Sequence, residues 1–287
     1  ARASASDSSV AVATRSAVST EVEIPSAPFL GSRVVEDIPL EEVFGFINET
    51  ALFKGQWQIR QGTKTRDEYR ELIDETIRPV FDRLKAQCLA EGLLVPKVVD
   101  GYFPCQSEGN DLVILQDDGR TERTRFTFPR QSSGKRLCLA DFFAPRDSGR
   151  VDVVGMQIVT VGRAATEYSQ KLFAEDNYAE YLYFHGLSVE TAEALAEYWH
   201  RRVRAELGIG GDDSPEVTKL FQQGYRGSRY SFGYPACPNL EDQTILFELL
   251  DPSRIDLVLT EEFQLDPEQS TSAIVAHHPE ARYFTME

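Results

Sequence analysis

Two short apolar runs on either side of a tight turn constrain the fold of this chain more than any other feature. Residues 112–115 (LVIL) and 124–128 (TRFTF) flank the turn Asp117-Asp118-Gly119. An Asp-Gly pair between two such runs is a strong hairpin signal, and the strands of a hairpin are antiparallel. Residues 151–161 form a further β-rich run. The chain is therefore expected to contain an antiparallel sheet.

Helical patterns lie on both sides of these strands. Residues 66–91 carry apolar side chains at helical spacing, and Pro79 inside this pattern should kink or divide the helix. Three later helices are predicted: one capped by Ser188, one from Ser214 to Gly224, and one from Asn239 to Leu250. Residues 255–284 alternate enough to be mostly strand. Helices and antiparallel strands without regular βαβ alternation indicate the α+β class.

Charge and composition exclude several classes of protein. The 287 residues hold 30 Lys and Arg against 46 Asp and Glu, a net charge of −16, which argues against a nucleic-acid partner because phosphate binding depends on basic side chains. There is no apolar run of about eighteen residues that could span a membrane. The four cysteines are widely separated and form no CxxC pair. This spacing predicts free thiols in a reducing, cytoplasmic compartment.

The first 20 residues differ from the rest of the chain. They contain six Ala and six Ser and almost no large apolar side chain, so they cannot bury enough surface to offset the entropy lost on ordering. We expect residues 1–23 to be a flexible interdomain linker and residues 24–287 to be one domain. A transit peptide is the alternative interpretation, although the amphipathic stripe of such peptides is missing. The chain opens on Ala, which suggests a piece of a longer protein.

The familiar catalytic motifs are missing from the sequence. It has no GxGxxG after a strand, no GxxxxGK[ST], no HExxH and no GxSxG. Residues 208–211 (GIGG) follow a helix and are interpreted as its end. His200, His277 and His278 have no Cys or acid at ligand spacing, so structural or surface roles are favoured and no metal site is predicted.

The most unusual stretch is residues 225–238 (YRGSRYSFGYPACP). Its glycines and prolines resist both helix and central strand, which predicts a stiff irregular loop that displays aromatic and guanidinium groups. Such a loop either packs its own aromatic rings or binds a ligand, with Arg holding a carboxylate and aromatic rings covering a flat ring. Composition alone favours neither of these two alternatives. Glu193 and Glu197, four apart on one helix, equally fit a solvated charge pattern.

Several stretches together resemble one family. The chain is similar to the C-terminal reactivation domain of cobalamin-dependent methionine synthase, the part that binds S-adenosylmethionine. The resemblance covers roughly residues 27–287, in the family's order. The stretches that carry it are residues 229–238 (RYSFGYPACP), 278–284 (HPEARYF), 138–142 (CLADF) and 192–198 (AEALAEY), with weaker matches at residues 51–57, 100–104 and 108–111.

This resemblance implies a fold and a reaction. The family fold is a C-shaped single α+β domain around a twisted antiparallel sheet flanked by helices. The full enzyme is a methyltransferase that makes methionine from homocysteine through cobalamin, which a neighbouring domain carries. When cobalamin is oxidised to inactive cob(II)alamin, this domain supplies S-adenosylmethionine, and a flavodoxin-like or other reductase donates one electron to restore methylcobalamin. The fragment alone is not expected to turn over.

The resemblance also implies roles for individual residues. Arg229 would hold the ligand carboxylate, and Tyr283 and Phe284 would line the ligand with their aromatic faces. Gly233 and Ala236 would let the loop backbone approach the ligand. Tyr234 would face the cobalamin. The methyl acceptor is cobalt, so no catalytic residue is expected. The best-matching family pattern has an acid where Asn48 and Gln223 stand, which makes Glu193 the favoured remaining carboxylate.

Two alternatives stay open from the sequence. The runner-up function is a non-catalytic S-adenosylmethionine-binding sensor or scaffold module for a corrinoid protein. For the electron donor, residues 200–204 (HRRVR) with Arg226 form the best candidate basic patch, because flavodoxins are themselves acidic. A solvated helix face is the competing interpretation of that patch.

Overall fold

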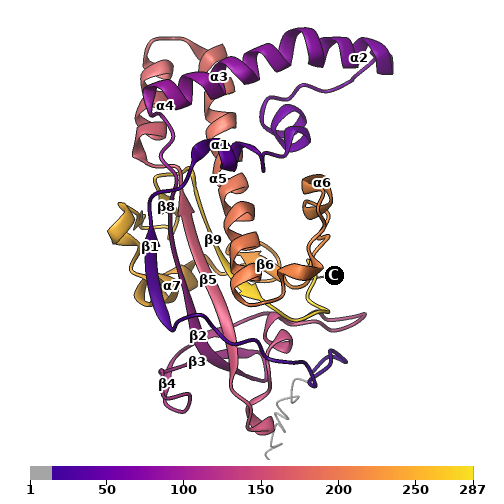
Figure 1. Ribbon diagram of the computed structural model, residues 1–287, viewed down its shortest axis with the longest axis vertical. Helices are drawn as coiled ribbons and strands as arrows, with labels where there is room; N and C mark the ends of the chain where they lie inside the picture. The colour runs from indigo at the N-terminus through magenta and orange to yellow at the C-terminus, as the bar shows by residue number, and fades with distance from the viewer. Residues whose placement is uncertain (1–14, 287) are drawn as a thin grey trace, which may run out of the picture.

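The computed structural model of the chain describes residues 15–286, and its centre is one antiparallel sheet. Its seven strands have the spatial order β4-β3-β2-β5-β9-β6, with β1 paired to β2 alongside β3 (Figure 1). The strands are β1 (Gly31–Val35), β2 (Lys97–Glu108), β3 (Asp111–Leu115), β4 (Glu122–Thr127), β5 (Asp152–Thr160), β6 (Ser228–Ser231) and β9 (Ser270–Ala276). The short strands β7 (Val258–Leu259) and β8 (Leu265–Asp266) pair separately. The predicted hairpin and the α+β class are confirmed.

The central strands are buried on both faces of the sheet. Every residue of β5 is buried. Val153 and Val159 belong to the hydrophobic cluster on one face, while Val154, Met156 and Ile158 belong to the cluster on the other. Because side chains alternate across a strand, this accounts for the continuous apolar run in the sequence: both of its faces are core.

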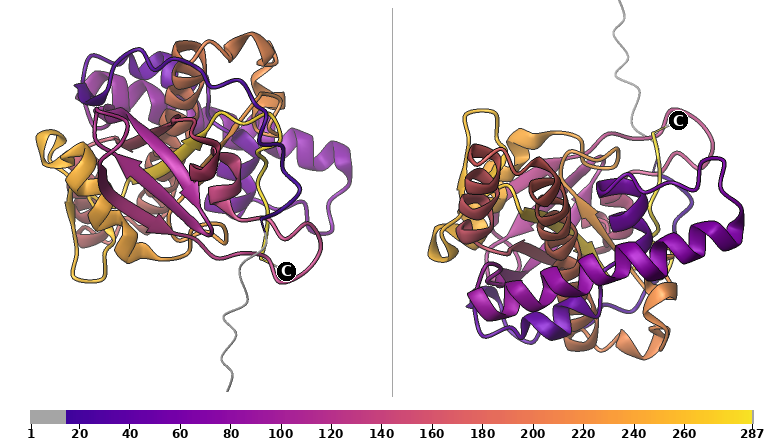
Figure 2. Two further views of the ribbon diagram at one scale, coloured as in Figure 1. Left: turned by 90° about the horizontal axis from the view of Figure 1, so that it is seen from below. Right: turned by 90° about the horizontal axis from the view of Figure 1, so that it is seen from above.

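One face of the sheet is covered by the long helices. α5 (Tyr178–Glu206) lies along the sheet, and α2 (Arg66–Leu72) and α3 (Arg78–Glu91) run across α5 and α4 (Arg163–Ala174), as the view from above in Figure 2 shows. The remaining α-helices are α1 (Leu40–Phe44), α6 (Val217–Leu220) and α7 (Gln243–Leu250). Two π-helical segments, η1 (Ala51–Gln56) and η2 (Ile73–Ile77), and the 3-10 segments η3 (Leu139–Phe142), η4 (Arg146–Ser148), η5 (Gly210–Asp212), η6 (Leu240–Asp242) and η7 (Pro252–Ile255) complete the described chain.

Close packing against α5 depends on a glycine. A Cβ atom added to Gly186 would lie 2.8 Å from Cδ1 of Trp57, so only glycine lets the indole approach the helix. The Nε1 of Trp57 donates a hydrogen bond to the backbone oxygen of Tyr183 at 2.9 Å. This contact fixes η1 against α5. In Figure 1, η1 and α6 lie on the same side of α5, opposite β1, and the outline of the molecule is concave there.

Some predicted element boundaries are confirmed and others are wrong. The pattern over residues 66–91 is divided at η2, which ends at Ile77, two residues before Pro79. Asn239 caps η6, which leads into α7. Ser188 does not cap a helix: α5 begins ten residues earlier, at Tyr178, and the Ser188 hydroxyl donates to the backbone oxygen of His185 at 2.8 Å.

Two further boundary predictions also need correction. The helix expected from Ser214 is only α6, which begins at Val217 and ends at Leu220. Of residues 255–284, only β7, β8 and β9 are strand, and the segment after Ala276 is irregular. This last segment instead packs into the hydrophobic cluster through Ala281 and Phe284.

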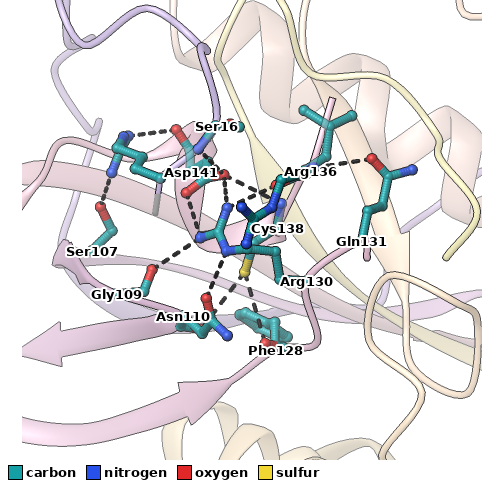
Figure 3. Close-up of polar contacts among 12 residues, drawn as sticks. Ser16, Ser107, Gly109, Asn110, Phe128, Arg130, Gln131, Arg136, Cys138 and Asp141 are labelled. Carbon is teal, nitrogen blue, oxygen red and sulfur yellow. Dashed lines mark hydrogen bonds and ion pairs between the residues drawn. The ribbon is translucent and has the colours of Figure 1, made fainter. Parts of the chain in front are cut away.

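The described part of the expected linker packs against the domain. Residues 15–22, here called the N-terminal segment, are held through Asp141: its carboxylate accepts from the backbone N–H of Ser16 at 3.2 Å and from Arg130 at 2.5 Å (Figure 3). Arg15 donates to the backbone oxygens of Asp141 and Phe143 at 2.6 and 2.8 Å, and Val18 is buried. Residues 1–14 lie outside the described residues, and the linker boundary at residue 23 remains a prediction.

Candidate functional site

A cavity of about 370 Å³ opens beside α5, where segments from distant parts of the sequence meet. One wall is a face of α5, another is β6 with the loop that follows it, and the residues around η1 and α6 complete the enclosure. The cavity volume falls within the range typical of small-molecule sites. Its lining residues are Phe46, Asn48, Ala51, Glu190, Glu193, Ala194, Glu197, Leu220, Phe221, Gln223, Tyr225, Arg229, Tyr230, Ser231, Tyr234, Ala236 and Tyr283.

Arg229 is the cation of this cavity. It projects from β6 toward α5, where its Nη2 lies 3.2 Å from Oε2 of Glu193 and its Nε lies 3.5 Å from Oε2 of Glu197. Burial opposes the charge of Arg229, but the two carboxylates keep its pKa above the ordinary value. The side chain is 19% exposed, so a ligand anion can reach a guanidinium that stays charged at every physiological pH.

A second layer of charge lies behind Arg229. Arg204 is fully buried and makes a two-point ion pair with Asp213, both N–O distances being 2.8 Å. It also lies 3.6 Å from Glu197 and stacks over the ring of Tyr225 at 3.9 Å. Burial raises the pKa of Glu197 although both arginines oppose the rise. Glu197 is therefore shared by two guanidinium groups, which fixes its position between them.

The acidic wall of the cavity comes from one face of α5. Glu190, Glu193 and Glu197 are spaced three and four residues apart, so they share a face. Sequence reasoning singled out the last two and missed Glu190, although its spacing continues the same series. Glu190 is 7% exposed, and burial, followed by the charge of Glu193, raises the pKa of its carboxyl group to about 7.

Asn48 and Gln223, the positions where the resemblance implies acids, are both engaged in local hydrogen bonds. The Oδ1 of Asn48 accepts from the backbone N–H of Ala51 at 3.2 Å, at the start of η1. Gln223 donates to the hydroxyl of Ser228 at 2.9 Å and accepts from the backbone N–H of Tyr283 at 3.2 Å. Both side chains line the cavity. Gln223 thereby ties the C-terminal segment to β6.

The loop after β6 is compact and brings two predicted residues to the cavity. Tyr234 and Ala236 line it, with Tyr234 54% exposed and Ala236 buried. Gly233 is not on the wall. Its φ of +85° favours glycine in this turn, and its N–H donates to the backbone oxygen of Cys237 at 3.0 Å. The role of Gly233 in this structure is therefore to shape the turn.

The two C-terminal aromatic residues point in different directions. Tyr283 lines the cavity and is 52% exposed. Phe284 is not on the cavity wall: it is buried in the hydrophobic cluster, with its ring centroid 6.2 Å from that of Phe142 and 6.0 Å from that of Tyr230. Adjacent residues in an extended segment face opposite ways, so one ring meets the cavity and the other supports β6 from behind.

The remaining candidates from the sequence are structural. His200 and Arg204 are fully buried, so the predicted basic patch is reduced on α5 to Arg201 and Arg202. His277 lies 2.7 Å from Asp152 and His278 lies 3.0 Å from the backbone oxygen of Ser19. No cluster of metal-ligating side chains occurs in residues 15–286, and none of the helices described there is long and apolar enough to cross a membrane. The four cysteines are free and buried.

The chain is similar to proteins of one known family. Residues 39–287 match the family described as vitamin B12 dependent methionine synthase, activation domain. The chain is 44% identical to a methionine synthase of Mycobacterium tuberculosis and 43% identical to one of Mycobacterium leprae, over 98% of its own length in each case. It spans about a quarter of the length of these relatives, 25% and 24% respectively.

A solved structure is similar as well. The crystal structure of the MetH reactivation domain bound to AdoHcy superposes with a TM-score of 0.83 and 29% sequence identity, covering 93% of this chain and 84% of that one. The fold expected from the resemblance, a single domain with a twisted antiparallel sheet, is thereby confirmed. The chain belongs to the family of activation domains of vitamin B12 dependent methionine synthases.

Proposed function

We propose that this domain binds S-adenosylmethionine in the cavity beside α5 and uses it to reactivate the cobalamin of a methionine synthase. In that reaction a reductase donates one electron to inactive cob(II)alamin, and the methyl group moves from the sulfonium sulfur to the cobalt, leaving S-adenosylhomocysteine. Within the longer protein this would sustain the transfer of methyl groups to homocysteine to make methionine.

The observation that carries this proposal is the charge pattern of the cavity. S-adenosylmethionine has a carboxylate, an ammonium, a sulfonium and a flat adenine ring. The cavity offers one accessible guanidinium, Arg229, an acidic wall on α5, and exposed aromatic rings at Tyr234 and Tyr283. AdoHcy, which the similar crystal structure contains, is S-adenosylmethionine without its transferable methyl group and has the same carboxylate, ammonium and adenine.

The residues of this chain would bind and orient the ligand rather than perform acid–base chemistry. Arg229 would hold the carboxylate through a charge-assisted contact, and Tyr283 would cover part of the ligand with its ring. Tyr234 borders this cavity and a neighbouring hollow that it shares with Glu193, so it would separate the ligand from the side on which cobalamin approaches. Phe284 would act indirectly, by supporting β6.

The longer relatives favour an enzyme over a stand-alone sensor. Both are methionine synthases about four times the length of the matched region, which leaves room for domains that carry cobalamin and bind homocysteine. A cobalamin-binding domain of the same chain and a flavodoxin-like or other reductase are the proposed partners. A sensor module would bind the ligand equally well but would not methylate cobalamin.

The experiment that tests the proposal is calorimetric titration of the chain with S-adenosylmethionine. We expect saturable binding, and Arg229→Ala should weaken it by roughly a hundredfold, because a charge-assisted contact in a half-buried site contributes a few kcal/mol. Arg229→Lys should recover part of the loss, since an ammonium group cannot make the planar two-point contact.

The same titration separates the possible outcomes. If the wild-type chain does not bind, the proposed ligand is wrong. If Arg229→Ala binds as tightly as wild type and unfolds at the same temperature, Arg229 does not contact the ligand. Methylation of reduced cobalamin by the full-length protein, measured from the absorbance of methylcobalamin, distinguishes the enzyme from a sensor.

A further inference from the structure

The acidic groups of the cavity are not equally available to a ligand. Glu197 is shared by Arg229 and Arg204, and Glu193 is hydrogen-bonded to Arg229. Glu190 lines the same cavity, and among the described residues its carboxylate has no basic group within 4.0 Å. It is therefore the acid of this wall that is not already neutralised by a cation of the protein.

Glu190 also lies beside Asn48 on the cavity wall, the position where the resemblance implies an acid. The backbone N–H of Asn48 faces its carboxyl group and opposes the rise of its pKa. Asn48 itself carries no charge, and its Oδ1 is engaged with the N–H of Ala51. The carboxylate of Glu190, which reaches the surroundings of Asn48 from α5, can therefore replace an acid at position 48.

We infer that Glu190 is the residue that recognises the α-ammonium group of the ligand, in place of an acid at position 48. This inference rests on the proposed function, because it assigns a role within the S-adenosylmethionine site. Burying a carboxylate without a protein cation is costly in the free protein, and a bound ammonium group removes that cost. The geometry thus favours a cationic ligand group at this wall.

The charged and titratable groups around Glu190 are limited in number. Glu193, one turn along α5, raises the pKa of Glu190, and Arg229 on β6 lowers it. Tyr225, Tyr230, Tyr234 and Tyr283 are the titratable groups on the other walls. Next to Asn48, Glu49 is neutralised by Arg78 at 2.8 Å. The part of the wall from residues 220–225 carries no charged side chain: it consists of Leu220, Phe221, Gln223 and Tyr225.

The first test compares wild type, Glu190→Gln and Glu167→Gln by calorimetric titration with S-adenosylmethionine. Glu190→Gln keeps the shape of the side chain and removes its charge, so binding at pH 8 should weaken by roughly tenfold. Glu167 lies on α4, is exposed and is not on the cavity wall, so its substitution should leave affinity unchanged. The wild-type affinity should fall from pH 8 to pH 6 as Glu190 is protonated, and that of Glu190→Gln should fall less.

The second test moves the charge and changes the ligand. In the double variant Asn48→Asp/Glu190→Gln, an acid returns to position 48, and most of the lost affinity should be recovered. S-adenosylhomocysteine keeps the ammonium group but lacks the sulfonium charge. Glu190→Gln should therefore weaken both ligands by the same factor.

Each failure has a distinct meaning. No binding by the wild-type chain contradicts the proposed function itself. Binding by the wild-type chain with unchanged affinity in Glu190→Gln overturns only the role of Glu190. A loss confined to S-adenosylmethionine would place Glu190 at the sulfonium and overturn its assignment to the ammonium group. A thermal scan of each variant verifies that it is folded.

Discussion

At the scale of single residues, the charged groups of the cavity are unequally balanced by opposite charges. Arg204, Glu197 and Arg229 form a buried chain of alternating charge in which each group has an opposite neighbour. Within residues 15–286, Glu190 has no basic group within 4.0 Å, and Arg229 only lowers its pKa from a greater distance. Burying a carboxylate without a nearby cation lowers the free energy of unfolding of the ligand-free protein. The destabilisation caused by Glu190 can therefore be measured without any ligand.

The pH dependence of stability should reveal that cost. The pKa of Glu190 is raised from 4.5 to about 7 in the folded chain, so the folded state binds the proton more tightly than the unfolded state. Stability contributed by this group is therefore present at low pH and is lost as pH rises through about 7. Glu190→Gln removes this loss and should be more stable than wild type at pH 8, by up to about 3 kcal/mol, because each pKa unit corresponds to about 1.4 kcal/mol.

Urea unfolding at pH 5 and pH 8 measures this effect. The difference in unfolding free energy between Glu190→Gln and wild type should increase from the lower pH to the higher. A constant difference would mean that folding does not change the pKa of Glu190. A difference that decreases with pH would mean that folding lowers this pKa.

At the scale of elements, the N-terminal segment is held against the rest of the described chain by hydrogen bonds. Besides the contacts of Arg15 and Ser16, the backbone N–H of Ser19 donates to Glu280 at 3.0 Å, and Arg150 donates to the backbone oxygens of Thr20, at 3.0 Å, and of Val22. The segment thus connects η3 with the turn after β9. Its small side chains suggested a mobile linker. Its backbone groups instead form hydrogen bonds with donors and acceptors from distant residues, which composition cannot reveal.

Truncated chains should show which part of the predicted linker contributes to the stability of the domain. A chain that begins at Val22 loses the buried Val18 and the hydrogen bonds of residues 15–19, and its unfolding free energy should fall by about 2 kcal/mol. A chain that begins at Arg15 keeps all these contacts and should match wild type. Urea midpoints of the three chains decide the question: equal midpoints would show that the N-terminal segment adds nothing to stability.

Local chemistry predicted some elements and failed for others, for identifiable reasons. The hairpin at residues 112–128 and the cap at Asn239 depend on neighbouring residues, and both are confirmed. Ser188 has the side chain of a helix cap, but Gly186 admits Trp57 and the helix continues through both residues. Residues 277–286 lack a strand partner in the described chain, although their sequence alternates. In these cases tertiary contacts outweigh local preference.

At the scale of the whole molecule, the cavity exists only because the fold joins distant segments. Its walls come from residues near 48, from α5, from residues 220–236 and from Tyr283. The sequence indicated Arg229 and the loop after it, since that composition is unusual. It could not indicate that Phe284 turns into the core or that Glu190 faces the cavity, because these depend on which side of a segment the rest of the chain covers.

The distribution of charge over the whole molecule also bears on the proposed electron donor. The chain carries a net charge of −16, so an acidic flavodoxin-like protein is repelled except near a local cation. Arg201 provides one beside the cavity: it is exposed, follows Glu197 by one turn on α5, and lies over the ring of Phe46, 5.9 Å from its centroid. Phe46 is itself a cavity residue. Arg202 is different, because Glu206 neutralises it at 3.1 Å.

Charge reversal at Arg201 should therefore slow electron delivery to the full-length protein. We expect Arg201→Glu to reduce the rate of reactivation by roughly tenfold at low salt and by less at high salt, since screening removes steering between exposed charges. Arg202→Glu should have a smaller effect. Arg66→Glu on α2, which alters the net charge equally, serves as the control. The measurement is the rate of methylcobalamin formation with a flavodoxin-like reductase at increasing ionic strength. Equal effects at Arg201 and Arg66 would mean that only total charge matters, whereas a rate indifferent to Arg201 would place the docking of the donor on another surface.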